Sequence, residues 1–160
     1  MAQQAVDRSV APKPGPAPTI TIKTPATFTL PNGLKVFVVQ NNKLPRVAVT
    51  LTIDRMPVLE GNKAGMVSMA GQLIRRGTTK MNKADLDEAI DFLGADINAS
   101  ATNVVASSLT SNFDKTFDLF AQVALSPAFS ADELEKIRKQ TLSGIAQGKE
   151  DPNSIARNVA

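Results

Sequence analysis

The stretch F-L-G-A-D-I-N-A-S-A-T-N-V-V-A-S-S-L-T-S, residues 92–111, decides the fold class of this chain. It predicts that a helix ends at Gly94 and that two strands, residues 96–101 and 104–111, follow one another directly. Strands joined in this way form antiparallel hairpins, whereas parallel strands need a long crossover between them. Together with three strands upstream, helices on either side and no steady alternation of strand and helix, the stretch indicates an α+β fold with a largely antiparallel sheet.

Three further strands are predicted upstream. Residues 26–30 and 34–38 carry apolar residues at every second position on either side of Pro31-Asn32-Gly33. Asn-Gly readily adopts the positive φ angles of a tight turn, so this segment predicts a hairpin. Residues 46–53 alternate branched apolar residues with Arg, Ala and Thr, which predicts a strand in a sheet with one buried face.

Four helices are predicted from apolar residues at helical spacing. They cover residues 65–75, 82–93, 114–125 and 130–149, and we expect them to pack on one face of the sheet. The predicted inward-facing residues are Met66, Ala70, Leu73, Leu86, Ile90, Leu93, Phe117, Phe120, Ala121, Ala124, Leu134, Ile137, Thr141 and Ile145.

Caps and stops set the ends of these helices. Asn82 is a preferred N-cap for the second helix, and Gly77 and Gly94 are typical residues at helix ends. Ser130 and Glu133 have the spacing of a capping box, in which each side chain bonds the backbone of the other residue.

The chain divides at about residue 25. Residues 1–25 hold five of the ten prolines, and such spacing predicts an extended linker or tail. Residues 26–160 form the predicted α+β domain. A further helix is predicted from Ser154, and because its apolar residues have no successor we expect the native chain to continue past Ala160.

Composition excludes several function classes. The 160 residues include 18 Lys and Arg and 15 Asp and Glu, mixed along the chain, so nucleic-acid binding is not predicted. There is no histidine and no cysteine, which excludes Ser-His and Cys-His catalysis, disulfides, and imidazole or thiolate metal sites. No apolar run is long enough to span a membrane. The polar residues after Met1 are typical of a mature exported protein, so a periplasmic location is expected.

Four stretches carry a family resemblance. They are T-F-T-L-P-N-G-L-K-V at 27–36, A-G-M-V-S-M-A-G-Q-L-I-R-R-G-T-T at 64–79, F-L-G-A-D-I-N-A-S at 92–100 and S-P-A-F-S-A-D-E-L at 126–134. In this order and at these intervals, they resemble the front of the first domain of the pitrilysin/insulinase metallopeptidase family, and more closely its processing-peptidase-like bacterial branch.

The resemblance implies a zinc site that this chain lacks. Active family members carry H-x-x-E-H on the helix after the third strand, where two histidines hold zinc and the glutamate is the base. The matching positions here are Ser68, Gly71 and Gln72; the third ligand falls at Gly144 and a helper glutamate at Ile137. None of these residues can bind zinc or accept a proton as the family's ligands and base do. Two alternative interpretations are a simple polar helix face and, for Gly71, a close-packing point.

A second family feature concerns peptide binding. In the relatives, the strand that matches Ile97, Asn98, Ala99 and Ser100 pairs through its backbone with an extended peptide. The alternative is an ordinary strand whose small residues serve packing.

Charged neighbours elsewhere have structural interpretations. Arg75 and Arg76 are predicted at a helix C-terminus, where positive charge suits the dipole, with a peptide-carboxylate contact as the alternative. The pairs Asp87-Glu88 and Glu150-Asp151 are predicted to lie on solvated helix faces.

The resemblance implies a non-catalytic half that forms a peptide-binding chamber with an active peptidase subunit, or with a second half of the same chain. No cofactor is expected in this chain, and zinc is expected only in the partner. Two alternatives stay open: a peptidase whose active residues lie beyond this sequence, and a structural binding module.

Overall fold

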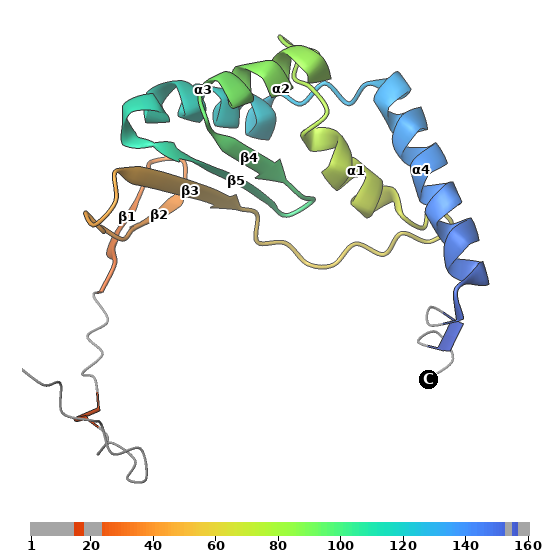
Figure 1. Cartoon of the computed structure of the whole chain (residues 1–160), viewed down its shortest axis with the longest axis horizontal. Coiled ribbons are helices and arrows are strands. Elements are labelled where there is room, and N and C mark those ends of the chain that lie inside the picture. Colours follow the sequence, from red (N-terminus) through yellow and green to blue (C-terminus); the bar gives the residue numbers. More distant parts are fainter. Residues whose placement is uncertain (1–14, 18–23, 153–154, 157–160) are drawn as a thin grey trace, which may run out of the picture. The chain divides into compact units, whose positions relative to one another are not determined.

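The computed structural model describes residues 15–17, 24–152 and 155–156, and the chain divides into two compact units, Met1–Lys43 and Leu44–Ala160 (Figure 1). The predicted tail, residues 1–25, lies mostly outside the described residues, as does part of the helix predicted from Ser154.

The first unit contains a hairpin. Strands β1 (Ala26–Thr29) and β2 (Lys35–Val38) pair antiparallel. Gly33 has a φ of 86°, and the Asn32 side chain accepts a hydrogen bond of 3.1 Å from the Leu34 amide. The predicted Asn-Gly hairpin is confirmed, because this turn needs the positive φ that glycine supplies.

The second unit holds a three-stranded antiparallel sheet in the order β3-β5-β4. Its strands are β3 (Arg46–Thr52), β4 (Asp96–Ala99) and β5 (Asn103–Leu109). The two predicted strands of residues 92–111 thus form a hairpin as expected. Its second strand ends two residues early, because Thr110–Asn112 turns into a 3-10 helix.

Four α-helices complete the second unit: α1 (Met66–Ile74), α2 (Lys83–Phe92), α3 (Phe113–Leu125) and α4 (Ala131–Glu150). Helices α2 and α3 cover one face of the sheet (Figure 1). No helix among the described residues is long and apolar enough to cross a membrane.

The core lies between the sheet and helices α2 and α3. On the opposite face of the sheet, Ala48, Thr50 and Thr52 are exposed, which confirms the prediction of helices on one face and an α+β class. Each large apolar side chain buried here contributes roughly 1.5–3 kcal/mol. The core residues are Leu86, Ile90, Leu93, Ile97, Val104, Ala106, Leu119, Phe120 and Val123.

Several predicted inward residues are not buried. Phe117 is 44% exposed and stacks against the ring of Phe120 at 5.6 Å, while Leu119 and Val123 fill the core instead. On α4 only Ile137 is fully buried, whereas Leu134, Thr141 and Ile145 are exposed, and on α1 Met66 is exposed. Helix α4 packs against α1, so only the stripe that faces α1 becomes core.

The capping predictions have mixed outcomes. The Asn82 side chain accepts a hydrogen bond of 3.0 Å from the Asp85 amide, so this N-cap is confirmed. The prediction of a capping box at Ser130 and Glu133 is wrong, because the Ser130 side chain makes no hydrogen bond to the first turn of α4. Glu133 instead forms ion pairs with Arg76 and Lys136, at 3.3 Å and 2.5 Å. Glu133 therefore bonds the Arg76 side chain, which is distant in sequence, and not the backbone of Ser130.

Candidate functional site

Helix α1 is held at its first turn by a carboxylate that sequence reasoning missed. Glu60 accepts hydrogen bonds from the Gly65 amide at 2.8 Å and from the Val67 amide at 2.7 Å. These backbone bonds lower the pKa of Glu60 below its ordinary value. A negative charge at a helix N-terminus is favourable, so Glu60 fixes where α1 begins.

Ser68 and Gln72 lie four residues apart on α1, so they share one face of the helix, and both are exposed. A hydroxyl and an amide offer zinc only weak neutral oxygen ligands, compared with the imidazole, thiolate and carboxylate groups of zinc sites. The two side chains therefore do not fit zinc. No group of three or more acidic residues suited to a metal occurs in the part of the chain that the structure describes.

Gly71 lies on the side of α1 that packs against the β4–β5 turn. It is buried, and a Cβ atom on it would lie 2.5 Å from the Ala101 backbone nitrogen and 3.1 Å from the Ser100 carbonyl carbon. Both atoms belong to the backbone, so neither moves cheaply. This confirms the close-packing interpretation of Gly71, and a side chain with a catalytic carboxyl has no room at this position.

Gly144 lies on α4, which runs beside α1 in the opposite direction (Figure 1). The Arg76–Glu133 ion pair joins the two helices at one end. Gly144 is eleven residues from Glu133 and Ser68 is eight from Arg76. At the rise of a helix, these separations correspond to about 16 Å and about 12 Å. A glycine offers no side chain to a metal, so Gly144 supplies no donor at the position where the resemblance predicts a third ligand.

The β4 edge is the second feature of the site. The Ser100 amide donates to the Asn103 carbonyl at 2.8 Å, and the Ile53 amide donates to the Thr102 carbonyl at 2.8 Å. Hydrogen bonds alternate along an antiparallel strand, so Ser100 and Asn98 bond inward to β5. The backbone groups of Ile97 and Ala99 consequently point away from β5, toward the outer edge of the sheet.

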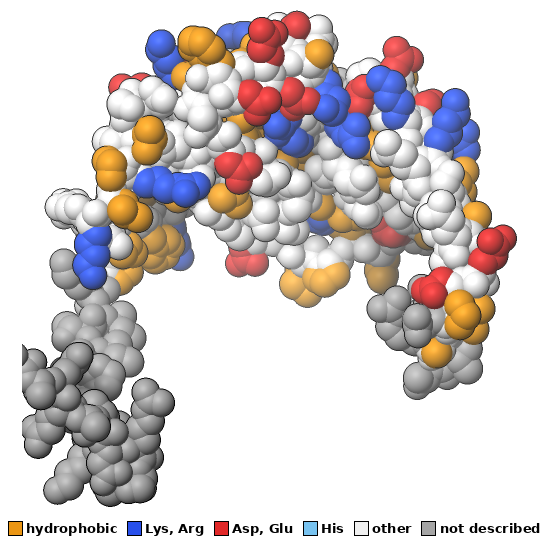
Figure 2. All heavy atoms as spheres, viewed as in Figure 1, with side chains coloured by type: hydrophobic (Ala, Val, Ile, Leu, Met, Phe, Trp, Pro, Cys, Tyr) orange, Lys and Arg blue, Asp and Glu red, His pale blue; other side chains and the backbone are white. Residues whose placement is uncertain are grey.

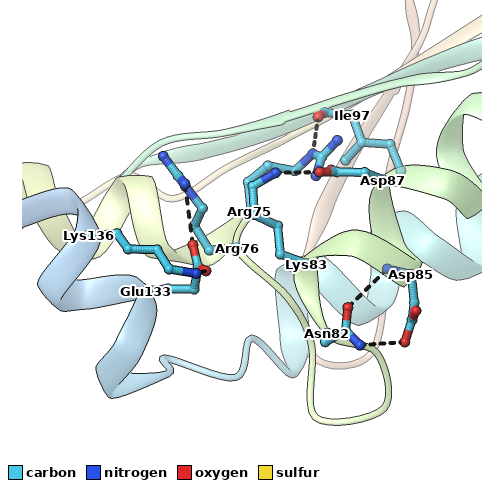
Figure 3. Close-up of polar contacts among 9 residues, drawn as sticks. All are labelled: Arg75, Arg76, Asn82, Lys83, Asp85, Asp87, Ile97, Glu133 and Lys136. Carbon is cyan, nitrogen blue, oxygen red and sulfur yellow. Dashed lines mark hydrogen bonds and ion pairs between the residues drawn. The ribbon is translucent and has the colours of Figure 1, made fainter. Parts of the chain in front are cut away.

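Arg75 contacts this outer edge (Figure 3). Its Nε donates to the Ile97 carbonyl oxygen at 2.8 Å, and its Nη1 forms an ion pair with Asp87 at 2.5 Å. Lys83 forms a second ion pair with Asp87. The solvated-face prediction for Asp87 is wrong, because this carboxylate is half-buried between two cations, whereas Glu88 is exposed as predicted.

Arg76 points away from Arg75, toward α4 (Figure 3). Its Nη1 pairs with Glu133, whose side chain is 10% exposed. The hydrogen bond from Lys136 lowers the pKa of Glu133, with charge from Arg76 acting in the same direction. Arg75 is the C-cap of α1, so the predicted helix-terminal location is confirmed, and the two arginines tie that terminus to α2 and β4 on one side and to α4 on the other.

The Asp87 cluster gives a pH-dependent prediction. Burial raises the pKa of Asp87, but hydrogen bonds and charge from Lys83 and Arg75 outweigh it and lower the pKa below the ordinary 3.8. Asp87 therefore stabilises the fold above that pH, and the stabilisation is lost as pH falls through the lowered pKa. We expect Asp87→Asn to cost about 1 kcal/mol of unfolding free energy at neutral pH. In urea titrations the difference from wild type should shrink below about pH 4; a difference that grows there would contradict the assignment.

Opposite charges lie side by side on the helices of the second unit. On the face shown in Figure 2, Lys and Arg side chains are interspersed with Asp and Glu. The pairs described above account for several of them, which agrees with the mixed charge pattern of the sequence.

The fold and the site together define a metallopeptidase-like α+β domain whose helix α1 carries Ser68, Gly71 and Gln72 and no imidazole, thiolate or carboxylate. The chain belongs to the insulinase family, peptidase family M16, whose family model matches residues 35–159. The resemblance to this family is thereby confirmed, and three of the four quoted stretches, residues 64–79, 92–100 and 126–134, lie within the matched residues.

Relatives in sequence are named zinc proteases. An uncharacterized zinc protease of Mycobacterium bovis is 28% identical over 153 residues, which cover 92% of this chain and 35% of the relative. One of Mycobacterium leprae is 29% identical over 129 residues, covering 78% and 29%. The chain thus spans about a third of the length of these curated relatives.

Solved structures share the fold. The inactive domain of an M16 peptidase from Pseudomonas fluorescens superposes with a TM-score of 0.73 and 27% identity, over 84% of this chain and 34% of that one. A protease from Helicobacter pylori gives a TM-score of 0.66 at 23% identity, over 82% and 33%, and supports the fold alone.

Proposed function

We propose that this protein is the zinc-less half of an M16 peptidase assembly and completes a peptide-binding chamber with an active, zinc-bearing subunit. The observation that carries the proposal is the close packing of Gly71 on Ala101, which leaves no room for a carboxyl side chain at the position that the resemblance assigns to the base. The similar Pseudomonas fluorescens domain is also described as inactive.

Within this proposal, an extended peptide lies along Ile97, Asn98, Ala99 and Ser100 and bonds the outward backbone groups of Ile97 and Ala99. Support comes from the edge position of β4, whose outward groups at Ile97 and Ala99 have no strand partner among the described residues. Strand addition to such an edge needs no metal and no catalytic side chain. Zinc in the partner, and export to the periplasm, are further parts of the proposal.

The second candidate is a peptidase that is active by itself through residues outside this sequence. It is favoured by the length of the relatives, because the chain spans about a third of them and they are named zinc proteases. The two candidates differ in where the zinc lies and in whether the protein hydrolyses peptides alone.

Reconstitution separates them. The protein is mixed with an active, zinc-bearing M16 peptidase of the same organism, and hydrolysis of an unstructured peptide is followed. We expect no hydrolysis by the protein alone, and a stable complex with raised activity in the mixture. A variant of the active subunit that lacks its glutamate base should be inactive in the complex. Chelator-sensitive hydrolysis by the protein alone would favour the second candidate instead.

A further inference from the structure

Helix α1 contacts both ends of the outward edge of β4. At one end Gly71 packs on the Ser100–Ala101 backbone, where a Cβ would lie 2.5 Å from the Ala101 nitrogen. At the other end the Arg75 Nε donates to the Ile97 carbonyl oxygen. The outward backbone groups of Ala99 lie between these two contacts. The edge that a peptide would join is thus bordered by one helix, which is a common way to protect an edge strand.

Arg75 occupies a position that an added strand requires. An antiparallel strand beside β4 would donate its own amide to the outward carbonyl of Ile97 and exchange two further bonds with Ala99. The guanidinium N–H already makes the first of these bonds, at 2.8 Å. A peptide that extends along the edge past Ala99 must therefore displace the Arg75 side chain.

An ion pair with Asp87 on α2 fixes the position of the Arg75 side chain. Its Nη1 pairs with Asp87 at 2.5 Å, Asp87 also pairs with Lys83, and the Arg75 side chain is only 26% exposed. Arg76, its neighbour, is turned toward Glu133 on α4 and makes no hydrogen bond to β4 in the described part of the chain. Arg75 therefore contacts the outer edge of β4 and Arg76 does not, so Arg76 is a suitable control for substitutions of Arg75.

We infer that Arg75 controls strand addition at β4: its bond to the Ile97 carbonyl closes the edge, and a peptide binds by displacing it. The inference rests on the proposed function, since it assumes that β4 receives peptides. It assigns Arg75 a role as the determinant of peptide affinity, in addition to joining α1, α2 and β4.

The test measures binding of a fluorescein-labelled, unstructured peptide rich in Val and Thr, by anisotropy, to the full-length protein. Arg75→Met keeps the bulk of the side chain and removes the donor, while Lys83 still balances Asp87. We expect Arg75→Met to bind the peptide about tenfold more tightly than wild type, the equivalent of one hydrogen bond. Arg76→Met, the matched control, should leave the affinity unchanged.

Two further variants keep the test decisive. Ala99→Pro in the Arg75→Met background should abolish the gain, because it removes the outward donor of the edge. Arg75→Lys keeps the charge beside Asp87 and should give a smaller gain in peptide affinity. If Arg75→Met does not melt cooperatively, Arg75→Lys is used in its place.

The outcomes separate the inference from the proposed function. Unchanged or weaker binding by the Arg75 variants, with wild-type binding still sensitive to Ala99→Pro, overturns the inference and leaves the function standing. A gain that survives Ala99→Pro places the peptide elsewhere and also overturns the inference. No peptide binding by any variant counts against both.

Discussion

Gly71→Ala is expected to lower the free energy of unfolding by about 1–3 kcal/mol, the usual cost of overpacking. The added Cβ would lie 2.5 Å from the Ala101 nitrogen and 3.2 Å from its Cα, so α1 or the β4–β5 turn must move. Urea denaturation followed by circular dichroism measures the change.

Gly144 supplies the matched control for this prediction. It also lies within a long helix, but a Cβ there would have no neighbour within 4 Å. Gly144→Ala should therefore raise stability by about 0.5–1 kcal/mol, because alanine favours the helix. If Gly71→Ala stabilised the protein as much as Gly144→Ala, the close contact between α1 and the turn would be refuted.

The same contrast extends to the family's catalytic positions. Gly144→Glu should be tolerated, since the position is exposed, whereas Gly71→Glu should unfold the protein or separate α1 from β4. Under the proposed function, the packing of Gly71 on Ala101 therefore excludes a glutamate base, and Gly71→Glu alone should not create an active site.

The second large effect is expected from Val105→Pro in the central strand β5. Asn98 pairs with Val105 in the register of β4 and β5, and the alternation of bonds directs the Val105 amide to the Asn98 carbonyl. Proline deletes this donor, and the carbonyl left unpaired costs about 1–3 kcal/mol by itself. We expect loss of the cooperative thermal transition.

Ala99→Pro is the control on the edge strand. Its amide points away from β5, so the substitution removes no bond within the sheet, and the variant should keep a cooperative transition. Thermal melts of the two variants test the assignment of β4 as an edge. If Ala99→Pro unfolded the protein and Val105→Pro did not, the strand order would be wrong.

Local patterns predicted most of the secondary structure. The Asn-Gly turn, the Asn82 cap and the glycine stops depend on residues within a few positions, and each has the expected geometry. The antiparallel order of β4 and β5 likewise depends on two strands joined by a short turn.

Features that depend on tertiary neighbours were predicted less well. Glu133 forms ion pairs with Arg76 and Lys136 instead of the predicted capping bond. Asp87 forms ion pairs with Arg75 and Lys83 and is therefore less exposed than predicted. Glu60 was missed because it caps a helix from five to seven residues away through an irregular loop.

For the candidate site, the sequence predicted which residues share a helix face but could not decide their role. The spacing placed Ser68 and Gln72 on one helix face, and the structure finds both exposed. The choice between a merely polar face and a close-packing point at Gly71 needed the distance to Ala101. The Arg75 contact needed the direction in which the Ile97 carbonyl points, which follows only from the pairing of β4 with β5.

Zinc stoichiometry shows whether this chain itself holds the metal. The full-length protein is dialysed against metal-free buffer after exposure to zinc, and the metal is measured by mass spectrometry beside an active M16 peptidase as the positive control. Because Ser68, Gln72 and Gly144 offer zinc no suitable ligands, we expect no stoichiometric zinc. About one tightly held zinc per chain, lost when Ser68 or Gln72 is replaced by Ala, would contradict this expectation.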